Sequence, residues 1–257
     1  MSHISFSELK VWNECTHKHK LQYIDKEKVF TSTEYTCFGT AMHETCEKSL
    51  LKQIREDQHD EYFENKFQEE LKIVQGQMEI NQVLVSDMVA QGKAILSELY
   101  QSLESYLAGY EVIATEQPLY ERIQNFDFEY NFKGFIDLVL KTPDGKIHII
   151  DWKTCSWGWD TKKKSDPMVI YQLTYYKNFY AQKFNIDPKM IETHFALLKR
   201  TAKKNRIEFF RVSSGTKKIE NANNLLTRAV LAIKNGKYIK NRLSCKGCEF
   251  YKTDLCK

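Results

Sequence analysis

The sequence predicts an α/β or α+β fold, in which helices cover a mixed β-sheet and the first half of the chain is helical. Two observations lead to this prediction. Residues 60–109 are nearly free of Gly and Pro and repeat Leu, Ile, Val and Met at helical spacing. From residue 111 onward, runs that alternate apolar and polar residues are interrupted by one amphipathic helical pattern. Strands and helices in this order form a sheet with helical layers.

The helical half begins with a helix start signal. Residues 5–8 (SFSE) have the spacing of a capping box, and the apolar residues after them predict a helix or helix pair that ends near residue 25. A second helix is expected to begin near Gly39–Thr40. Residues 60–109 are expected to form two more helices, with Gly76 as a possible break.

The second half is expected to supply the sheet. Strands are predicted at residues 111–120, 127–140, 146–153, 192–199 and 206–212. An amphipathic helix is predicted at Pro167–Gln182, between the third and fourth strands. A final helix, at residues 216–235, should lead into a tail that contains cysteines.

The composition is that of a globular protein. Of the 257 residues, 42% are hydrophobic and 13% aromatic, which is enough for a proper core. We expect one domain over residues 1–257, with a mainly helical part (1–110), a sheet part (111–215) and a C-terminal helix with the cysteine tail (216–257). The sequence has no run of 18 apolar residues and no charged-then-apolar leader, so we expect no membrane span and a cytoplasmic location.

Positive charge is concentrated in the last quarter of the chain. The net charge is only +4, but residues 199–246 contain 14 Lys and Arg against Glu208 and Glu220. The run TKKK at residues 161–164 adds to it. Such a block can attract a polyanion with little sequence preference. The alternative is a solvated lysine-rich surface, which is the commoner explanation of a charge run.

One predicted hairpin carries charged residues where a sheet should close its core. In residues 134–154 (GFIDLVLKTPDGKIHIIDWKT), the segment TPDG fits a type I turn followed by a left-handed Gly. That turn pairs residue 142 with 146, and the same register pairs Asp137 with Asp151. Because side chains alternate between faces, Lys153 projects from the same face as Asp151, whereas Ile150 and Trp152 point to the other.

Two carboxylates a few Å apart repel each other unless a cation lies between them. Hard divalent ions such as Mg²⁺ or Mn²⁺ take oxygen ligands in this way. The alternative is a surface salt bridge in which Lys153 neutralises one of the acids, and the spacing of the residues leaves both readings open.

Five short segments resemble, in their order, the PD-(D/E)XK nuclease superfamily, and specifically its RecB-type exonuclease branch, which includes CRISPR-associated and AddB-like iron–sulfur exonucleases. The segments are GTAMHE (39–44), ATEQPL (114–119), GFID (134–137), IIDWKT (149–154) and QLTYY (172–176). They extend across most of the chain, and together they are more specific than any one of them. The resemblance implies a restriction-endonuclease-like fold with a mixed central sheet flanked by helices.

The resemblance also implies roles for single residues. Asp137 and Asp151 would be metal ligands, and the backbone carbonyl of Trp152 would add another. Lys153 would orient or activate the attacking water and stabilise charge on the phosphate. His43 would bind the same metal, although a lone helical His is more often a packed or exposed residue.

Further candidates come from the same comparison of motifs. Glu116 matches an acidic position on the first long strand, where it would hold the lysine or a water molecule, or it is an ordinary edge-strand glutamate. Gln172 and Tyr176 are four residues apart and share one face of their helix, which in similar nucleases faces the catalytic strands. Candidate contacts to nucleic acid are Tyr176, Lys199, Arg200, Lys203 and Lys204.

The function expected from these features is metal-dependent hydrolysis of phosphodiester bonds by a DNA exonuclease, on single strands or duplex ends. Recombination, repair, CRISPR adaptation and phage DNA metabolism are the expected settings. The sequence has no Walker-type phosphate loop, so a helicase or recombination partner would be a separate chain. The alternatives are an endonuclease of the same fold and a non-catalytic DNA-binding protein with a degenerate nuclease fold.

The cysteine tail suggests a second cofactor. Seven cysteines in a chain without a leader argue against a disulfide framework. Cys245, Cys248 and Cys256 suit thiolate ligation, and Cys15 matches the early cysteine of iron–sulfur RecB-type nucleases, which implies a 4Fe-4S cluster.

This sequence departs from the iron–sulfur pattern in two ways. Thr16 stands where a proline is usual, and the gap between the last two tail cysteines is long. Zinc is therefore the rival cofactor, with His17 or His19 replacing one thiolate, and unligated cysteines are the third possibility. The remaining cysteines are expected to be small buried apolar residues: Cys37, Cys46 and Cys155.

Overall fold

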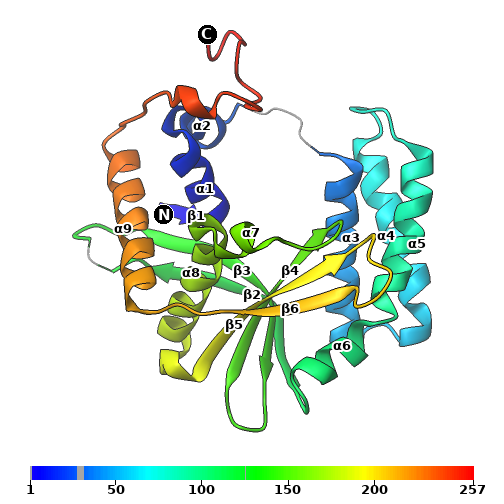
Figure 1. Ribbon diagram of the computed structural model, residues 1–257. Helices are drawn as coiled ribbons and strands as arrows, with labels where there is room; N and C mark the ends of the chain where they lie inside the picture. The colour runs from blue at the N-terminus through cyan, green and yellow to red at the C-terminus, as the bar shows by residue number, and fades with distance from the viewer. Residues whose placement is uncertain (1, 28–31, 125) are drawn as a thin grey trace. The chain divides into compact units, whose positions relative to one another are not determined.

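The computed structural model describes residues 2–27, 32–124 and 126–257 and confirms the predicted mixed α/β architecture (Figure 1). The described strands are β1 (His3–Ser5), β2 (Glu111–Arg122), β3 (Asn131–Lys141), β4 (Ile147–Cys155), β5 (Ile191–Lys199) and β6 (Ile207–Val212). The described helices are α1 (Phe6–Glu14), α2 (Thr16–His19), α3 (Glu34–Leu50), α4 (His59–Val74), α5 (Gln82–Leu96), α6 (Leu99–Tyr106), α7 (Thr161–Ser165), α8 (Pro167–Phe184) and α9 (Thr216–Lys234). A π-helical turn, Lys20–Ile24, follows α2.

The chain divides into two compact units. The smaller unit comprises residues 1–30, 119–134 and 214–257, and the larger comprises residues 31–118 and 135–213. In the smaller unit, β1 pairs in parallel with the beginning of β3. In the larger unit, β3 is antiparallel to β4, β4 is parallel to β5, and β5 is antiparallel to β6, so the sheet is mixed. Strand β2 pairs with β3.

The hairpin of β3 and β4 has the predicted register. The N–H of Thr142 donates to the carbonyl of Lys146 at 3.0 Å, and the N–H of Gly145 donates to the carbonyl of Thr142 at 2.9 Å. Gly145 has φ 82°, the left-handed conformation that glycine adopts most easily. The ladder then pairs Leu138 with Ile150, and each further pair keeps the same sum of residue numbers. The local chemistry of the turn therefore fixes which residues face each other along both strands.

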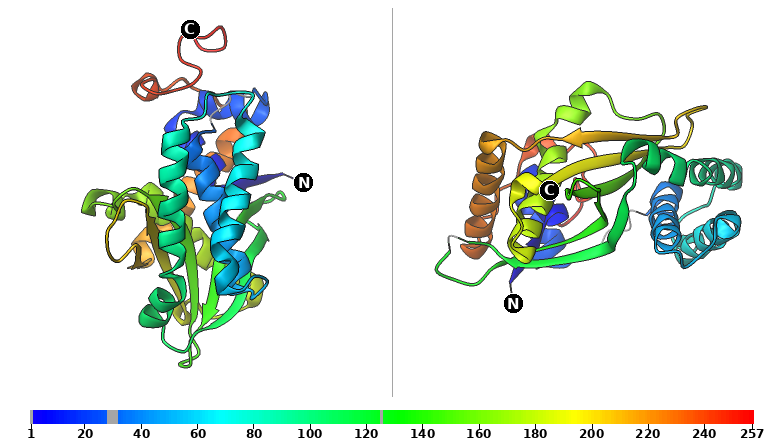
Figure 2. Two further views of the ribbon diagram at one scale, coloured as in Figure 1. Left: turned by 90° about the vertical axis from the view of Figure 1, so that its right-hand side faces the viewer. Right: turned by 90° about the horizontal axis from the view of Figure 1, so that it is seen from below.

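Helices α3, α4 and α5 form a bundle that covers one face of the sheet of the larger unit (Figure 2). Its core contains the rings of Phe38, Phe63 and Phe67, which contact one another edge-on or stacked. The predicted core residues Ile150 and Trp152 of β4 lie in the same apolar cluster. The opposite face of β4 is therefore the one from which Asp151 and Lys153 project.

Several predicted boundaries were wrong for local reasons. Helix α3 begins at Glu34 rather than near Gly39–Thr40, because Thr33 and the residue three positions later cap each other's backbone N–H groups. Residues 60–109 form three helices rather than two, although the break at Gly76 is confirmed. The sequence analysis did not predict β1 or the short helix α7.

Only half of the predicted capping box at residues 5–8 forms. Ser5 Oγ accepts a hydrogen bond from the N–H of Glu8 at 3.1 Å, but the Glu8 carboxylate contacts Nε2 of buried His19 at 2.8 Å instead of the cap. None of the described helices is both long and apolar enough to cross a lipid bilayer.

Candidate active site

The two hairpin aspartates lie at the end of the β3–β4 ladder. Asp151 is 1% exposed, and extending the register by one residue from Leu138 and Ile150 places Asp137 opposite it. Oδ2 of Asp137 accepts a hydrogen bond from the backbone N–H of Trp152 at 2.8 Å. Asp137 thus binds the N–H of the residue that follows Asp151. This hydrogen bond holds the Asp137 carboxylate near Asp151 on one face of the hairpin.

Lys153 forms an ion pair with Oδ2 of Asp151. Its side chain is 32% exposed, whereas that of Asp151 is 2% exposed, so the ammonium is the more accessible partner of this pair. Burial acts to lower the pKa of Lys153, but Asp151 and Asp137 act against it and the pKa is raised overall. Lys153 is therefore a fixed cation and not a proton acceptor.

The acidic pair carries more negative charge than one lysine can neutralise. Burial, followed by the charge of Asp151, raises the pKa of Asp137 well above its usual value. A divalent cation removes this conflict because it binds both carboxylates in their ionised form. Two carboxylates and a nearby backbone carbonyl are hard oxygen donors, so the residues present fit Mg²⁺ or Mn²⁺.

Helix α8 supplies the next contact. Its start is defined by Asp166, whose side chain accepts from the N–H of Met168 at 2.8 Å. One turn further along, Nε2 of Gln172 donates to Oδ1 of Asp151 at 2.8 Å and to the hydroxyl of Tyr176 at 3.2 Å. The predicted shared face of Gln172 and Tyr176 is thus turned toward the acidic pair. Tyr176 is 6% exposed, and burial raises its pKa.

His43 reaches the same place from α3. Its Nδ1 lies 3.6 Å from Oδ2 of Asp137, which is longer than a hydrogen bond. Burial lowers the pKa of His43 to about 4, outweighing the opposite effect of Asp151. The imidazole is therefore neutral at neutral pH, which is the form that binds a metal ion.

Two glutamates add to the acidic character of the site, and the sequence analysis missed one of them. Burial, Glu47 and Asp151 raise the pKa of Glu116, which lies on β2. Glu116 has φ 46°, a left-handed conformation that is costly inside a strand and that occurs preferentially at functional sites. Glu47 lies one helical turn after His43 on α3, and that i+4 spacing was the signal available in the sequence.

The residues predicted to contact nucleic acid differ in their exposure and in their contacts with other protein side chains. Lys199 donates to Glu208 at 3.1 Å. Arg200 is 8% exposed, and its guanidinium donates to two side chains from other segments, so protein partners occupy it. Lys203 and Lys204 are exposed on the turn between β5 and β6. This turn follows the end of β5 that lies beside residues 153–155 of β4.

The smaller unit contains a cavity of about 350 Å³. Four of the seven cysteines line it: Cys15, Cys245, Cys248 and Cys256. Basic side chains, among them Lys18, Lys240 and Arg242, line it as well. The sequence therefore identified four cysteines that share one cavity.

Hydrogen bonds around Cys15 join the N-terminal helices to the tail. The N–H of Asn241 donates to Sγ of Cys15 at 3.3 Å, and its side chain donates to the carbonyl of Glu14 at 2.9 Å. Of the two histidines considered as alternative ligands, His17 lines the cavity, whereas His19 is buried against Glu8. The geometry thus excludes His19 from the cavity.

A further group of titratable residues was missed by the sequence analysis. His148, Glu192 and His194 are the one trio of His, Cys, Asp or Glu residues, among residues 2–27, 32–124 and 126–257, whose donor atoms all lie within 4.8 Å of one another. Burial lowers the pKa of both imidazoles, that of His194 to about 3, so both rings are neutral. The pairing of β4 with β5 brings the three residues together, so no local sequence pattern predicts this cluster.

Known proteins resemble this chain in sequence and in fold. The model of the PD-(D/E)XK nuclease superfamily matches residues 3–256. A crystal structure of a provisionally named exonuclease from Eubacterium rectale is similar with a TM-score of 0.61 and 14% identity, covering 98% of this chain and 89% of that one. The structure of SSO0001 aligns with a TM-score of 0.37 and 17% identity over 84% of this chain and 92% of that one. No curated protein matches.

The raised pKa of Asp137 makes a prediction about stability without metal. An acid whose pKa is higher in the folded state destabilises the fold once pH exceeds its unfolded pKa of about 3.9. In EDTA, the stability of Asp137→Asn relative to the wild type should therefore increase from pH 4 to 8. Each ~1 kcal/mol of difference in the free energy of unfolding should appear as a difference of ~2–4 °C in Tm. Thermal denaturation measures this difference.

Asp144→Asn is the matched control. The hydrogen bond from Thr142 holds the pKa of Asp144 below its usual value, so that variant should gain no stability with rising pH. If the Tm values of Asp137→Asn and the wild type stay parallel across the pH range, the repulsion between the two buried acids is not a force in this fold.

Proposed function

The chain belongs to the PD-(D/E)XK nuclease superfamily, and we propose that it is a metal-dependent DNA exonuclease acting on single strands or duplex ends. The observation that carries the proposal is the buried pair of Asp137 and Asp151, with Lys153 and Gln172 both bound to Asp151. A structural salt bridge needs one acid and one base. Here the second acid, its raised pKa and the amide contact are left without a structural purpose unless a cation binds.

We assign the metal to the oxygen atoms of Asp137, Asp151 and the Trp152 carbonyl, with neutral His43 beside them. When bound, Mg²⁺ or Mn²⁺ makes a water molecule more acidic and neutralises charge on the scissile phosphate. The chain's own residues do the rest. Gln172 fixes the orientation of Asp151 by its 2.8 Å hydrogen bond to Oδ1, and Lys153 holds the other oxygen of that carboxylate.

Lys153 and Glu116 have separate tasks in this proposal. The ammonium of Lys153, kept charged by the two aspartates, stabilises the negative charge that develops on the phosphate in the transition state. Glu116 lies near the pair, and burial, Glu47 and Asp151 raise its pKa, so its carboxylate is a better proton acceptor for a water molecule than an ordinary glutamate. These roles divide the work between a fixed cation and a proton acceptor.

An exposed aromatic ring and lysines on the segment after β4 favour a single-stranded substrate. Trp157 is 72% exposed on the loop that follows β4, four residues after Lys153. Lys163 lies 4.6 Å from the ring centre of Trp159, which keeps the basic helix α7 next to this loop. Aromatic rings stack on unpaired bases, and lysines attract the backbone, which together form a binding platform for single strands.

For the tail we propose a 4Fe-4S cluster bound by Cys15, Cys245, Cys248 and Cys256, and with it membership of the RecB-type branch. All four cysteines line one cavity of about 350 Å³. A 4Fe-4S cluster uses four thiolates, each of which binds a different iron.

Two other functions are compatible with this fold. An endonuclease would use the same chemistry, and a DNA-binding protein with an inactive site would not need the intact acidic pair. We propose that residues 1–257 work as one nuclease domain in recombination, repair, CRISPR adaptation or phage DNA metabolism, with any helicase as a separate partner. The family match across residues 3–256 spans both units and supports a single functional domain.

Asp151→Asn should bind DNA but lose cleavage by at least about 10²–10³-fold, because the amide keeps the shape and removes the charge. The measurement is cleavage of labelled linear and circular, single-stranded and double-stranded DNA in Mg²⁺, Mn²⁺ or EDTA. Digestion of linear substrates alone supports an exonuclease, and cleavage of circles supports an endonuclease. No metal-dependent cleavage by the wild type would leave the DNA-binding alternative, and wild-type rates in the variant would remove Asp151 from the mechanism.

Trp157→Ala should weaken single-strand binding by about five- to a hundredfold, since one base stacked on an aromatic ring contributes about 1–3 kcal/mol. Trp157→Phe keeps a ring and should retain most of the affinity. Fluorescence anisotropy with labelled oligonucleotides, using a blunt duplex for comparison, measures both. Equal affinities of the alanine and wild-type proteins for single strands would mean that the exposed ring does not bind bases.

Anaerobically purified protein should contain about four irons per chain and absorb visible light, because a 4Fe-4S cluster has four irons. The cluster needs all four cysteine thiolates as ligands. Cys256→Ser should lose the absorption and part of the stability, whereas Cys155→Ser, outside the cavity, should retain both. Iron and zinc analysis with a visible spectrum tests this. Stoichiometric zinc without iron would replace the cluster with a zinc site.

A further inference from the structure

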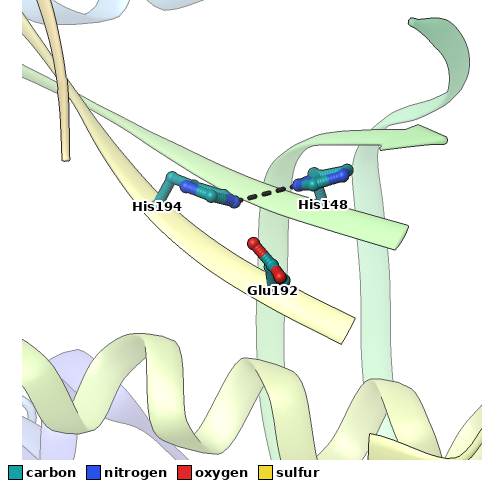
Figure 3. Close-up of side chains that lie close together, drawn as sticks. All are labelled: His148, Glu192 and His194. Atoms are coloured by element: carbon teal, nitrogen blue, oxygen red, sulfur yellow. Dashed lines mark hydrogen bonds between the residues drawn. The ribbon is translucent and has the colours of Figure 1, made fainter. Parts of the chain in front are cut away.

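A second cluster of potential metal ligands lies on the face of the sheet opposite Asp151. The register of β4 and β5 pairs His148 with Glu192 and Ile150 with His194, and all four project from one face because residues alternate in steps of two. Asp151 pairs with Phe195 and therefore projects from the other face. The cluster is thus separate from the active site described above, and Figure 3 shows its three polar groups facing one another.

The positions of the donor atoms suit a small tetrahedral ion. Nδ1 of His148 lies 3.1 Å from Nε2 of His194, and Glu192 contributes an oxygen within 4.8 Å of both. Nitrogen ligands at about 2.0–2.1 Å in a tetrahedron lie about 3.4 Å from each other. The two rings therefore need to separate by only a few tenths of an ångström to hold an ion between them.

Outer hydrogen bonds already fix the ring of His148. Thr142 Oγ1 donates to Asp144 at 2.5 Å, so it can only accept at its 2.9 Å contact with Nε2 of His148. Nε2 therefore carries the proton and Nδ1 has a lone pair facing His194. This arrangement, an imidazole oriented by a hydrogen bond on the side away from the metal, is the usual support of a metal-binding histidine.

A hydrogen bond also orients the ring of His194, and its direction can reverse. Its Nδ1 lies 2.9 Å from the hydroxyl of Tyr106 on α6, and that hydroxyl can either donate or accept. Without a metal, Tyr106 donates to Nδ1 and Nε2–H donates to His148. With a metal, the proton moves to Nδ1, Tyr106 accepts it in a hydrogen bond, and Nε2 becomes a ligand. No proton is lost or gained in this exchange.

Glu192 completes the set. Its ion pairs with Lys146 and Arg211, both at 3.2 Å, use Oε1, so the metal would take Oε2. The two cations reduce the charge of the carboxylate and fix its position on the strand. They make the site weaker than an isolated His₂Glu set, but they do not block the second oxygen.

We propose that His148, Glu192 and His194 form a second metal site that cross-links β4 and β5 on the face opposite Asp151. The site would select Zn²⁺ or a similar nitrogen-binding ion over Mg²⁺. Two imidazoles and one carboxylate are ligands that favour zinc, whereas Mg²⁺ prefers oxygen atoms alone. A water molecule would be the fourth ligand. This proposal does not depend on the nuclease assignment, because it uses none of the residues of the catalytic face.

The test is titration of the full-length protein with Co²⁺ and Zn²⁺ in an excess of Mg²⁺, followed by visible spectroscopy and thermal denaturation. We expect saturable Co²⁺ bands without sulfur-to-cobalt charge transfer, displaced by Zn²⁺, and a rise in Tm with Zn²⁺. Glu192→Gln, which keeps the shape of a partly exposed residue, and His148→Gln should each lower the affinity at least tenfold. His59→Gln, a buried histidine on α4, is the control and should bind like the wild type.

Circular dichroism of each variant shows whether it is folded, and Glu192→Gln decides the outcome if His148→Gln unfolds. Equal affinity of the wild type and Glu192→Gln for Co²⁺ would overturn the proposal. So would a spectrum in which all bound Co²⁺ shows thiolate bands, since the ion would then occupy the cysteine cavity.

Discussion

The repulsion between two buried carboxylates is the constraint on which the larger unit depends. Asp137 and Asp151 face each other at the end of one hairpin, where burial raises the pKa of Asp137 and one lysine offsets only part of the charge. A fold keeps such an arrangement at a cost in stability. We propose that a divalent cation bound between the two carboxylates offsets this cost.

The turn of the hairpin decides which residues lie on each of its two faces. Its turn fixes the register, and alternation along β4 then sends Asp151 and Lys153 to one face and His148, Ile150 and Trp152 to the other. Ile150 and Trp152 pack under the helices α3–α5, which makes the strand rigid. The same strand carries Asp151 and Lys153 on its opposite face.

Electrostatics separates the roles of groups that look interchangeable in the sequence. Lys153 remains charged because both aspartates are near it, His43 remains neutral because it is buried, and the pKa of Glu116 is raised by burial and by Glu47. Lys153 is therefore a cation, His43 is a neutral imidazole, and the carboxyl of Glu116 holds its proton to a higher pH than usual. None of these states follows from residue type, since each depends on neighbours that come from different helices and strands.

The sequence by itself determined the mixed fold, the hairpin register, the facing of Asp137 and Asp151, and the shared face of Gln172 and Tyr176, because these follow from turn chemistry and from periods of two and 3.6 residues. The tertiary structure decided the rest. It brought Glu47 near Glu116, buried Arg200 among protein partners, and placed His148 beside His194 from 46 residues away. Contacts between distant segments depend on how whole elements pack, and no local pattern in the chain encodes that packing.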